Sequence, residues 1–233
     1  MKKNILFTML FALCALVLTS CDKKSEGLSR FTYYPTITLY GDTYLVWEKG
    51  ETYVDPGYYS ELNGEDVTSQ VTVSGALDVN KSGVYKLTYS VMNEDGINAS
   101  ASRTVVVLDS KSPIEGFYMT QANSFRSYNG NDVKYGKDYE ILIIDNGDGT
   151  LEVDDLFGGW YSQRAGYGAN YAMWGIISLA GDGTVGLVES LIKGWGDGLD
   201  GLSGSYDAAN STFKVQAVYN KNTMFFNQTW VKE

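Results

Sequence analysis

The sequence predicts an all-β protein made of two domains. Short apolar and β-branched runs recur between turn residues, and these runs lack helical spacing. Glycine is abundant at 26 residues, proline is scarce at 3, and aromatic residues make up 14% of the chain. This mixture suits short strands joined by glycine turns. The length of 233 residues permits two modest domains that each bury a core.

Residues 1–20 have the pattern of a lipoprotein signal peptide. Lys2 and Lys3 form a basic start, an apolar run covers residues 5–18, and small residues lead directly to Cys21. The run is shorter than the about 20 residues that cross a bilayer as a helix, and a cleavage site follows at once. The pattern therefore predicts cleavage before Cys21, lipidation of that cysteine and a membrane anchor.

Residues 21–30 are polar and lack periodicity, which predicts a flexible tether between the lipid and the first domain. Without residues 1–20 the chain has 16 basic and 28 acidic residues, a net charge of −12. No basic cluster occurs after Lys24, so nucleic acid is not an expected partner.

The residue types exclude many kinds of catalysis. The chain has no histidine, which excludes Ser-His-Asp and Cys-His catalysis and histidine-containing zinc sites. Its two cysteines are Cys14, in the segment that is removed, and the lipidated Cys21, so no disulfide is expected. Only carboxylate chemistry of the glycosidase type or an oxygen-ligated calcium site would remain.

The first domain is predicted over residues 31–109. Its expected strands are Thr36–Tyr40, Val67–Val73, Gly83–Met92 and Ala99–Leu108. Within the third of these, apolar and polar residues alternate, which predicts one buried face. Asn93–Gly96 then supplies a hairpin turn in which the glycine is free to take a positive φ.

Four segments of this domain resemble a bacterial immunoglobulin-like domain of surface proteins. The segments are Glu51–Tyr58, Asp66–Thr68, Gly83–Tyr89 and Ala99–Val107. The resemblance covers about residues 36–108 and departs from the usual pattern only after the turn glycine, at Gly96–Asn98. It implies a β-sandwich that acts as a spacer or adhesion module without catalysis.

The polar link Asp109–Pro113 is the predicted boundary, and the second domain is predicted over residues 114–233. Its expected strands are Tyr139–Ile144, Gly175–Leu179, Thr184–Val188, Thr212–Tyr219 and Thr223–Val231. Asp-Gly turns occur at Asp148-Gly149 and Asp182-Gly183. These features predict an antiparallel β-barrel or a β-sandwich, and Glu189–Lys193 could add one helical turn.

This second domain is similar to an uncharacterised all-β C-terminal domain of Bacteroidetes surface lipoproteins from glycan-utilisation systems. The similar segments are Asp154–Tyr161, Tyr167–Tyr171, Gly194–Asp197 and Gly204–Asp207. The resemblance implies a lipid anchor in the outer membrane, an outward-facing protein and outer-membrane transport proteins as partners, but it assigns no residue a role. Asp22 is a sorting signal in some bacteria, so inner-membrane retention and a periplasmic orientation stay open.

Aromatic residues concentrate in glycine-rich parts of the second domain. Flat rings can cover the apolar faces of sugars while nearby polar groups bind the hydroxyls. The predicted ligand-binding residues are Trp160, Tyr161, Tyr167, Tyr171, Trp174, Trp195 and Asp197. The alternative is that these rings form the core of a small β domain.

Other carboxylate groups are weaker candidates for a site. Asp145–Gly149 fails the EF-hand template, because Gly147 occupies the place of the second oxygen ligand. Asp154 and Asp155 are adjacent, so on a strand they point to opposite faces. Asp197 and Asp200 lie in a glycine-rich loop whose geometry the sequence leaves open. We therefore predict no catalytic residue, no metal and no cofactor.

Together, these observations favour a surface lipoprotein that binds a polysaccharide or oligosaccharide without acting as an enzyme. The alternative is a structural or adhesion lipoprotein that contacts other outer-membrane proteins. A sugar-binding site needs several aromatic rings in one groove, whereas a protein interface needs a broad surface of mixed Tyr, Trp and Arg residues.

Overall fold

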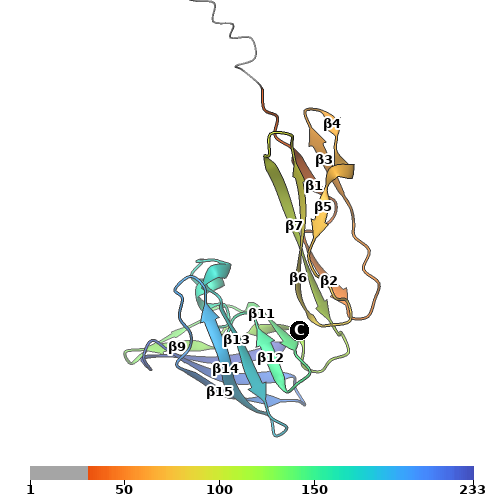
Figure 1. The fold of residues 1–233 in the computed structure, drawn as a ribbon. Coiled ribbons are helices and arrows are strands. Elements are labelled where there is room, and N and C mark those ends of the chain that lie inside the picture. The colour runs from red at the N-terminus through yellow and green to blue at the C-terminus, as the bar shows by residue number, and fades with distance from the viewer. Residues whose placement is uncertain (1–30) are drawn as a thin grey trace, which may run out of the picture.

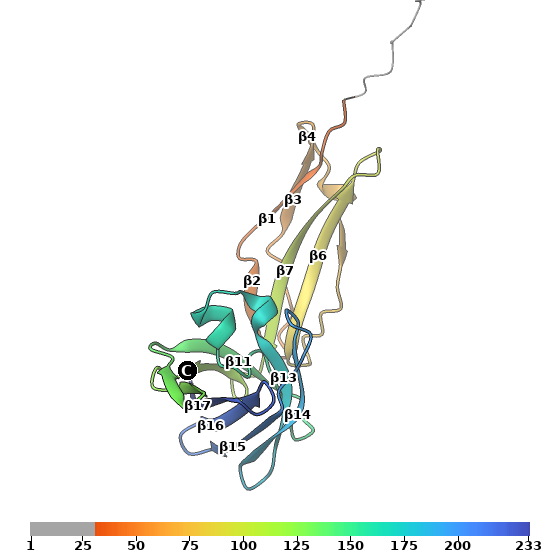
Figure 2. The ribbon, with the colours of Figure 1, turned by 90° about the vertical axis from the view of Figure 1, so that its left-hand side faces the viewer.

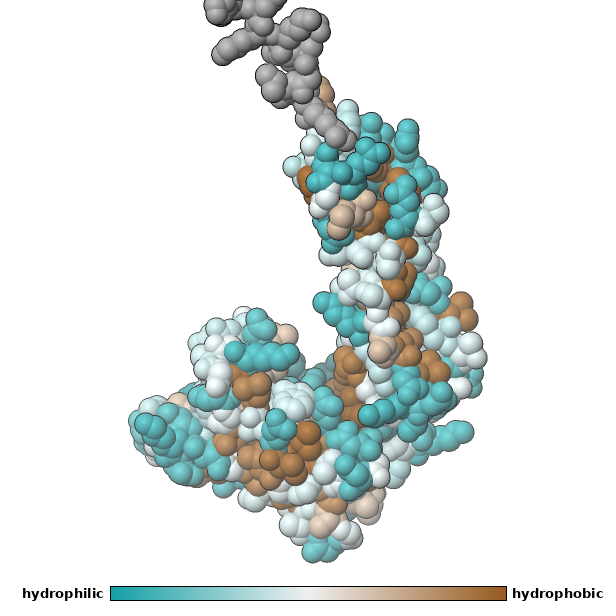
Figure 3. All heavy atoms as spheres, viewed as in Figure 1, coloured by the Kyte–Doolittle hydropathy of each residue, from teal (hydrophilic) through white to brown (hydrophobic). Residues whose placement is uncertain are grey.

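The computed structural model describes residues 31–233, so the signal peptide, Cys21 and the tether lie outside the described part. Two β units follow one another along the chain and lie end to end (Figures 1 and 2). No helix among the described residues is long and apolar enough to cross a membrane. The surface visible in Figure 3 is mostly hydrophilic or intermediate, with an apolar patch on the wall of the second unit.

The first unit is a sandwich of two sheets. One sheet contains, in spatial order, β1 (Thr36–Leu39), β3 (Tyr58–Leu62) and β4 (Glu65–Asp66). The other contains β2 (Tyr44–Glu48), β7 (Asn98–Leu108), β6 (Gly83–Met92) and β5 (Thr72–Ser74), with β2 and β7 parallel. The immunoglobulin-like sandwich predicted from the resemblance is therefore present.

Strand β6 shows the predicted alternation. Leu87, Tyr89 and Val91 are buried, whereas Lys86 and Met92 are exposed. The buried face packs with Val105 and Val107 of β7 to form the core between the sheets. The turn after β6 contains Gly96 at φ 79°, as predicted.

The predicted strand Val67–Val73 is wrong in its first half. Residues Thr68–Gln70 form a 3-10 turn (η1), and only Thr72–Ser74 is strand. The reason is local, because the Asp66 carboxylate accepts a hydrogen bond from Thr68 N at 2.8 Å and starts the turn.

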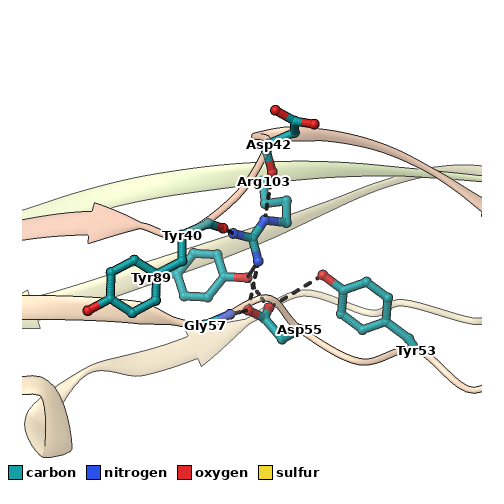
Figure 4. Close-up of polar contacts among 7 residues, drawn as sticks. All are labelled: Tyr40, Asp42, Tyr53, Asp55, Gly57, Tyr89 and Arg103. Atoms are coloured by element: carbon teal, nitrogen blue, oxygen red, sulfur yellow. Dashed lines mark hydrogen bonds and ion pairs between the residues drawn. The ribbon is translucent and has the colours of Figure 1, made fainter.

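A buried arginine ties the two sheets together (Figure 4). Arg103 on β7 is fully buried, and its guanidinium donates to Asp55 Oδ1 at 2.7 Å. It also donates to the main-chain oxygens of Tyr40 at 2.5 Å and Asp42 at 3.1 Å. Tyr89 donates its hydroxyl hydrogen to Asp55 as well. Asp55, in one of the segments that carry the family resemblance, is thus part of a polar network around the buried Arg103.

The second unit is a closed barrel of eight antiparallel strands, which decides between the barrel and the sandwich. Its strands are β8 (Gly116–Thr120), β11 (Tyr139–Asp145), β12 (Thr150–Val153), β13 (Met173–Leu179), β14 (Thr184–Ile192), β15 (Gly201–Asp207), β16 (Thr212–Tyr219) and β17 (Met224–Lys232). Pairing of β17 with β8 closes the barrel. The hairpin of β9 (Phe125–Tyr128) and β10 (Asn131–Lys134) extends from β17. Side chains fill the interior, and Phe213, Phe226 and Trp230 are fully buried.

The second unit contains the predicted Asp-Gly turns but not the possible helical turn. The Asp-Gly turns are present, with Gly149 at φ 86° and Gly183 at φ 85°. The possible helical turn at Glu189–Lys193 is wrong, because β14 continues to Ile192 through its pairing with β13. Val188 and Leu191 of β14 are exposed apolar residues of this wall.

The two units are joined by a packed junction. Val106 and Leu108 of β7 pack against Leu142 and Ile144 of β11. Beside them the carboxylate of Glu115, only 3% exposed, accepts hydrogen bonds from Ser82 Oγ at 2.9 Å and Asp145 N at 3.3 Å, and from Asp109 N. Glu115 therefore bonds to both units and to the link between them.

Replacement of Arg103 by methionine should lower the free energy of unfolding by roughly 3 kcal/mol, because it leaves Asp55 and two carbonyl groups without their shared donor.

Burial raises the pKa of Asp55, but hydrogen bonds from Tyr89, Gly57 and Arg103 outweigh burial and bring it below its usual value of 3.8. The stabilisation is therefore complete above pH about 4 and is lost as the pH falls through the folded pKa. Urea unfolding at several pH values measures both effects. Lys86→Met, on the exposed face of β6, is the matched control, and an equal loss in both variants would contradict the prediction.

Replacement of Glu115 by alanine should destabilise the junction by about 1–3 kcal/mol, because buried donors on both units lose their acceptor. Glu48 lies at the same junction but is not buried and makes only long contacts, of 3.3 and 3.4 Å, with Ser110 N. Glu48→Ala should therefore cost much less in the same urea titration. A loss in Glu115→Ala no greater than in Glu48→Ala would show that the carboxylate does not hold the units together.

Candidate functional site

The aromatic segment after β12 is organised by the carboxylate of Asp155, which is 2% exposed. Oδ1 accepts hydrogen bonds from Phe157 N at 2.9 Å and Met173 N at 3.1 Å. Oδ2 accepts from Gly159 N at 3.2 Å and Ser162 Oγ at 2.5 Å. Burial raises the pKa of Asp155, and these four hydrogen bonds oppose the rise. One carboxylate thus holds both ends of the segment.

Two consecutive glycines set the direction of this segment. Gly158 has φ 56° and Gly159 has φ 82°, in the region that favours glycine. A Cβ on Gly158 would lie 2.2 Å from Gln228 Oε1, and one on Gly159 would lie 2.7 Å from Tyr139 Cβ. Glycine is therefore required at both positions on steric grounds. After this turn the chain forms η2 (Trp160–Arg164), a single π-helical turn, and then η3 (Ala169–Tyr171), a 3-10 turn.

The result is a group of rings at one end of the barrel, which we call the aromatic surface. It consists of Tyr161, Tyr167, Tyr171, Trp195 and Tyr219. The Trp195 ring centroid lies 4.9 Å from that of Tyr161 and 5.2 Å from that of Tyr171, both edge to face. Tyr167 is 55% exposed and Trp195 is 43% exposed. Five rings from three parts of the chain are therefore in one cluster, and two of them are open to solvent.

Glycines also bring the Trp195 loop against this cluster. Gly194 N donates to Asn170 O at 2.7 Å, which joins the loop after β14 to η3. A Cβ on Gly194 would lie 2.5 Å from Tyr171 Cε1, so a larger residue would push the loop away from the ring. The close approach of the two loops depends on this glycine.

Asp197 lies at the edge of the aromatic surface beside Tyr219. The Tyr219 hydroxyl donates to the Asp197 carboxylate, with distances of 3.1 and 3.0 Å to its two oxygens. Burial and then this carboxylate raise the pKa of Tyr219, so the phenol stays neutral at physiological pH. The Tyr219 ring lies almost parallel to that of Trp195, at 20° and 6.2 Å. This edge therefore offers a ring and a carboxylate together.

Two of the seven predicted ligand-binding residues do not belong to the aromatic surface. Trp160 is 3% exposed and packs against Tyr135, 5.0 Å between centroids, so it is a core residue. Trp174 lies on the outer wall of β13, where alternation places Met173 inside, and its indole N–H donates to Glu152 Oε1 at 2.7 Å. These placements correct the expectation that both rings lie in one cluster with the other predicted residues. Tyr161, Tyr167, Tyr171, Trp195 and Asp197 do lie together.

Tyr219 is the functional candidate that sequence reasoning missed. It is the last residue of β16, and the Asn220-Lys221-Asn222 turn that follows has positive φ at all three positions. The polar run after a strand is a turn signal and could have placed Tyr219 at a barrel end. Its position beside Trp195 depends on the closure of the barrel, which the sequence pattern does not reveal.

The alternative carboxylate sites are explained by the turns that contain them. Asp145 Oδ1 accepts from Gly147 N at 2.8 Å, and Asp148 Oδ1 accepts from Thr150 N at 2.9 Å. Asp200 Oδ2 accepts from Asn222 N at 3.0 Å. Across residues 31–233, no group of three carboxylates is placed to hold a metal ion.

A cleft of about 550 Å³ lies at the opposite end of the barrel. It is lined by the β11–β12 and β13–β14 turns together with Ile114, Leu179 and Tyr206. Glycines and aliphatic side chains make up much of this lining, with Asp145 and Asp182 held in their own turns. The aromatic surface thus has the more specific chemistry of the two ends.

Comparisons with known proteins place the chain in a family. A family described as a C-terminal domain matches residues 108–232, and one described as "Bacterial surface protein, Ig-like domain" matches residues 37–107. The crystal structure of a lipoprotein from Bacteroides thetaiotaomicron is 39% identical, with a TM-score of 0.67, over 85% of this chain and 100% of that chain. The chain belongs to the family of this lipoprotein. Membership of this lipoprotein family, together with the surface-protein domain, indicates a cell-surface lipoprotein.

Two further matches are much weaker. Both are structures of parts of ZmpB from Clostridium perfringens, one of the M60 catalytic domain with CBM51-1 and CBM51-2, the other of CBM51-2 in complex with GlcNAc and INT domains. The first is 21% identical over 52% of this chain and 15% of that chain, with a TM-score of 0.29. The second is 24% identical over 51% of this chain and 31% of that chain, with a TM-score of 0.27. No functional conclusion follows from them. No curated protein matches the chain.

Replacement of Asp155 by asparagine should loosen the segment that carries Tyr161 and Tyr167. An amide N–H would face the donor Gly159 N in place of an acceptor, at an expected cost of about 1–3 kcal/mol in the free energy of unfolding. Hydrogen exchange at Phe157, Gly159 and Met173 and urea unfolding both measure this effect. Asp154→Asn is the matched control, because Asp154 is exposed and accepts from Leu142 N at 2.8 Å. Unchanged exchange at all three amides in Asp155→Asn would disprove the role of this carboxylate.

Proposed function

We propose that this protein is a lipoprotein of the outer membrane that faces outward and binds carbohydrate on the aromatic surface, without converting it, as part of a glycan-uptake system. The observation that carries the proposal is the clustering of five rings at one end of the barrel. Exposed rings suit the apolar C–H faces of sugars, and phenol and carboxylate groups suit the hydroxyls.

The order of the two units supports this proposal. Tyr33 lies at the end of the immunoglobulin-like unit next to the β6–β7 turn, where its carbonyl oxygen accepts a hydrogen bond from Asn93 Nδ2 at 2.7 Å. The barrel packs at the other end of these strands, against Leu108. The ten residues of β6 span roughly 30 Å. The barrel lies at the end of the first unit opposite to β4 (Figures 1 and 2). An anchor at Cys21 would therefore leave the barrel as the part farther from the bilayer.

A second candidate function is contact with another outer-membrane protein. The observation that favours it is the apolar patch on the outer wall of β14, where Val188 is 56% exposed and Leu191 is 40% exposed. Trp174 lies across from Leu191 on the neighbouring strand. This patch shares no residue with the aromatic surface, so substitutions can test the two functions independently.

Replacement of Trp195 by alanine should weaken carbohydrate binding by roughly tenfold, equivalent to about 1.4 kcal/mol, because the exposed indole would supply much of the stacking area. Titration calorimetry of the mature chain, carrying Cys21→Ser to avoid the lipid, against a panel of soluble polysaccharides measures the effect. Trp174→Ala removes the same side chain from the outer wall and should leave the affinity unchanged.

Three results would contradict this proposal. One is the absence of binding to every polysaccharide in the panel. Another is equal weakening in Trp174→Ala and Trp195→Ala, which would place the contact elsewhere. A third is unfolding of Trp195→Ala in thermal denaturation, which would make this ring part of the core.

A further inference from the structure

Two arginines lie at the edge of the aromatic surface, against the same indole. The guanidinium carbon of Arg126, on β9, is 4.8 Å from the Trp160 ring centroid. The guanidinium carbon of Arg164, at the end of η2, is 4.2 Å from the same centroid. Tyr161, the residue after this tryptophan, belongs to the aromatic surface. Two positive charges from distant parts of the chain are thus held beside the rings.

Packing, rather than pairing with acids, holds Arg126 in place. Its side chain also lies over the Tyr128 ring, at 5.8 Å, and its buried Nε–H has no acceptor. Strand pairing sets Arg126 opposite Phe226, which lies in the core beneath Tyr161. Burial raises the pKa of Tyr161 above its usual value, and the guanidinium of Arg126 opposes this rise.

Arg164 presents its terminal amino groups to solvent. Its Nε donates to Tyr135 O at 3.1 Å, which fixes the plane of the guanidinium on the indole. The residue itself is exposed. The two terminal nitrogens of this fork therefore have the geometry to bind an acidic group bidentately.

Neither arginine is neutralised by the protein. Within residues 31–233 the Arg103–Asp55 contact is the sole ion pair, although the chain is strongly acidic. The nearby carboxylates are engaged in their own loops, because Asp138 accepts from Ala122 N at 2.6 Å and Asp132 accepts from Ser127. Lys137, over the Tyr139 ring at 5.2 Å, adds a further positive charge on this side. The two guanidinium groups therefore have no carboxylate partner within the described part of the chain and are available to pair with an acidic group of a ligand.

We propose that the aromatic surface binds an anionic glycan, whose carboxylate or sulfate group is held by Arg126 and Arg164 while the rings cover the sugar. This inference rests on the proposed carbohydrate-binding function and narrows it to a substrate class. Planar forked guanidinium groups match both oxyanions, and stacking on Trp160 orients them before the ligand arrives. Asp197, at the Tyr219 edge, would stay next to sugar hydroxyls and away from the acidic group.

The test compares charged polymers with their neutral counterparts. Calorimetry at low salt would use polygalacturonate against its carboxyl-reduced form, and dextran sulfate against dextran, so that the two pairs separate carboxylate from sulfate. We expect one charged polymer to bind at least tenfold more tightly than its neutral partner. Arg164→Gln, which changes an exposed side chain, should reduce that ratio by roughly tenfold. Arg126→Lys keeps the positive charge but loses the forked guanidinium group. It should reduce the charged-to-neutral affinity ratio less than Arg164→Gln does.

The control is Lys214→Gln, which removes one positive charge from an exposed position of β16 outside the aromatic surface. It should leave the charged-to-neutral ratio unchanged. Equal affinities for charged and neutral polymers would overturn this inference and leave the proposed function intact. An equal fall in the ratio for Lys214→Gln and Arg164→Gln would also overturn it, because general charge would then explain the preference. Failure of every polymer to bind, neutral or charged, would instead contradict the proposed function itself.

Discussion

The aromatic surface depends on one buried carboxylate. Asp155 accepts four hydrogen bonds from a segment that would otherwise have to bury its main-chain N–H groups without partners. A buried carboxylate is costly unless donors satisfy its oxygens, and here four donors must point at the same group. This requirement restricts the segment to a single path. That path buries Phe157 and Trp160 and leaves Tyr161 at the surface. The same segment carries Tyr167 and Tyr171, and it holds the Trp195 loop through the hydrogen bond from Gly194 N to Asn170 O.

Buried charged groups play the same part at two other joints of the molecule. Arg103 links the two sheets of the first unit, and Glu115 links the first unit to the barrel. With only two cysteines, both before residue 22, no disulfide can serve at these joints. Each group bonds to segments far apart in sequence, and its removal leaves unsatisfied partners on both sides. Charge burial therefore sets the geometry where apolar packing alone would be less specific.

The two ends of the barrel have different roles in this arrangement. One end carries tight Asp-Gly turns around a shallow cleft, and the other carries the long connections that hold the aromatic surface. Turns of four residues suffice to connect antiparallel strands, so the fifteen residues between Asp155 and Tyr171 exceed what topology requires. Long ordered connections on a rigid barrel are where binding residues commonly occur. The proposed contacts to sugar rings and to an acidic substituent both lie at this end.

The sequence by itself determined the all-β class, the strand pattern of β6 and β16, and the glycine turns, because these depend on alternation and on residues adjacent in the chain. It also identified the segments that carry four of the five rings of the aromatic surface. Only the tertiary structure decided that the second unit closes as a barrel, since pairing of β17 with β8 joins segments about a hundred residues apart. It likewise decided that Trp160 is buried in the core, that Trp195 is exposed and that Tyr219 joins the aromatic surface. Burial of a ring is set by what packs over it, and those neighbours come from distant strands.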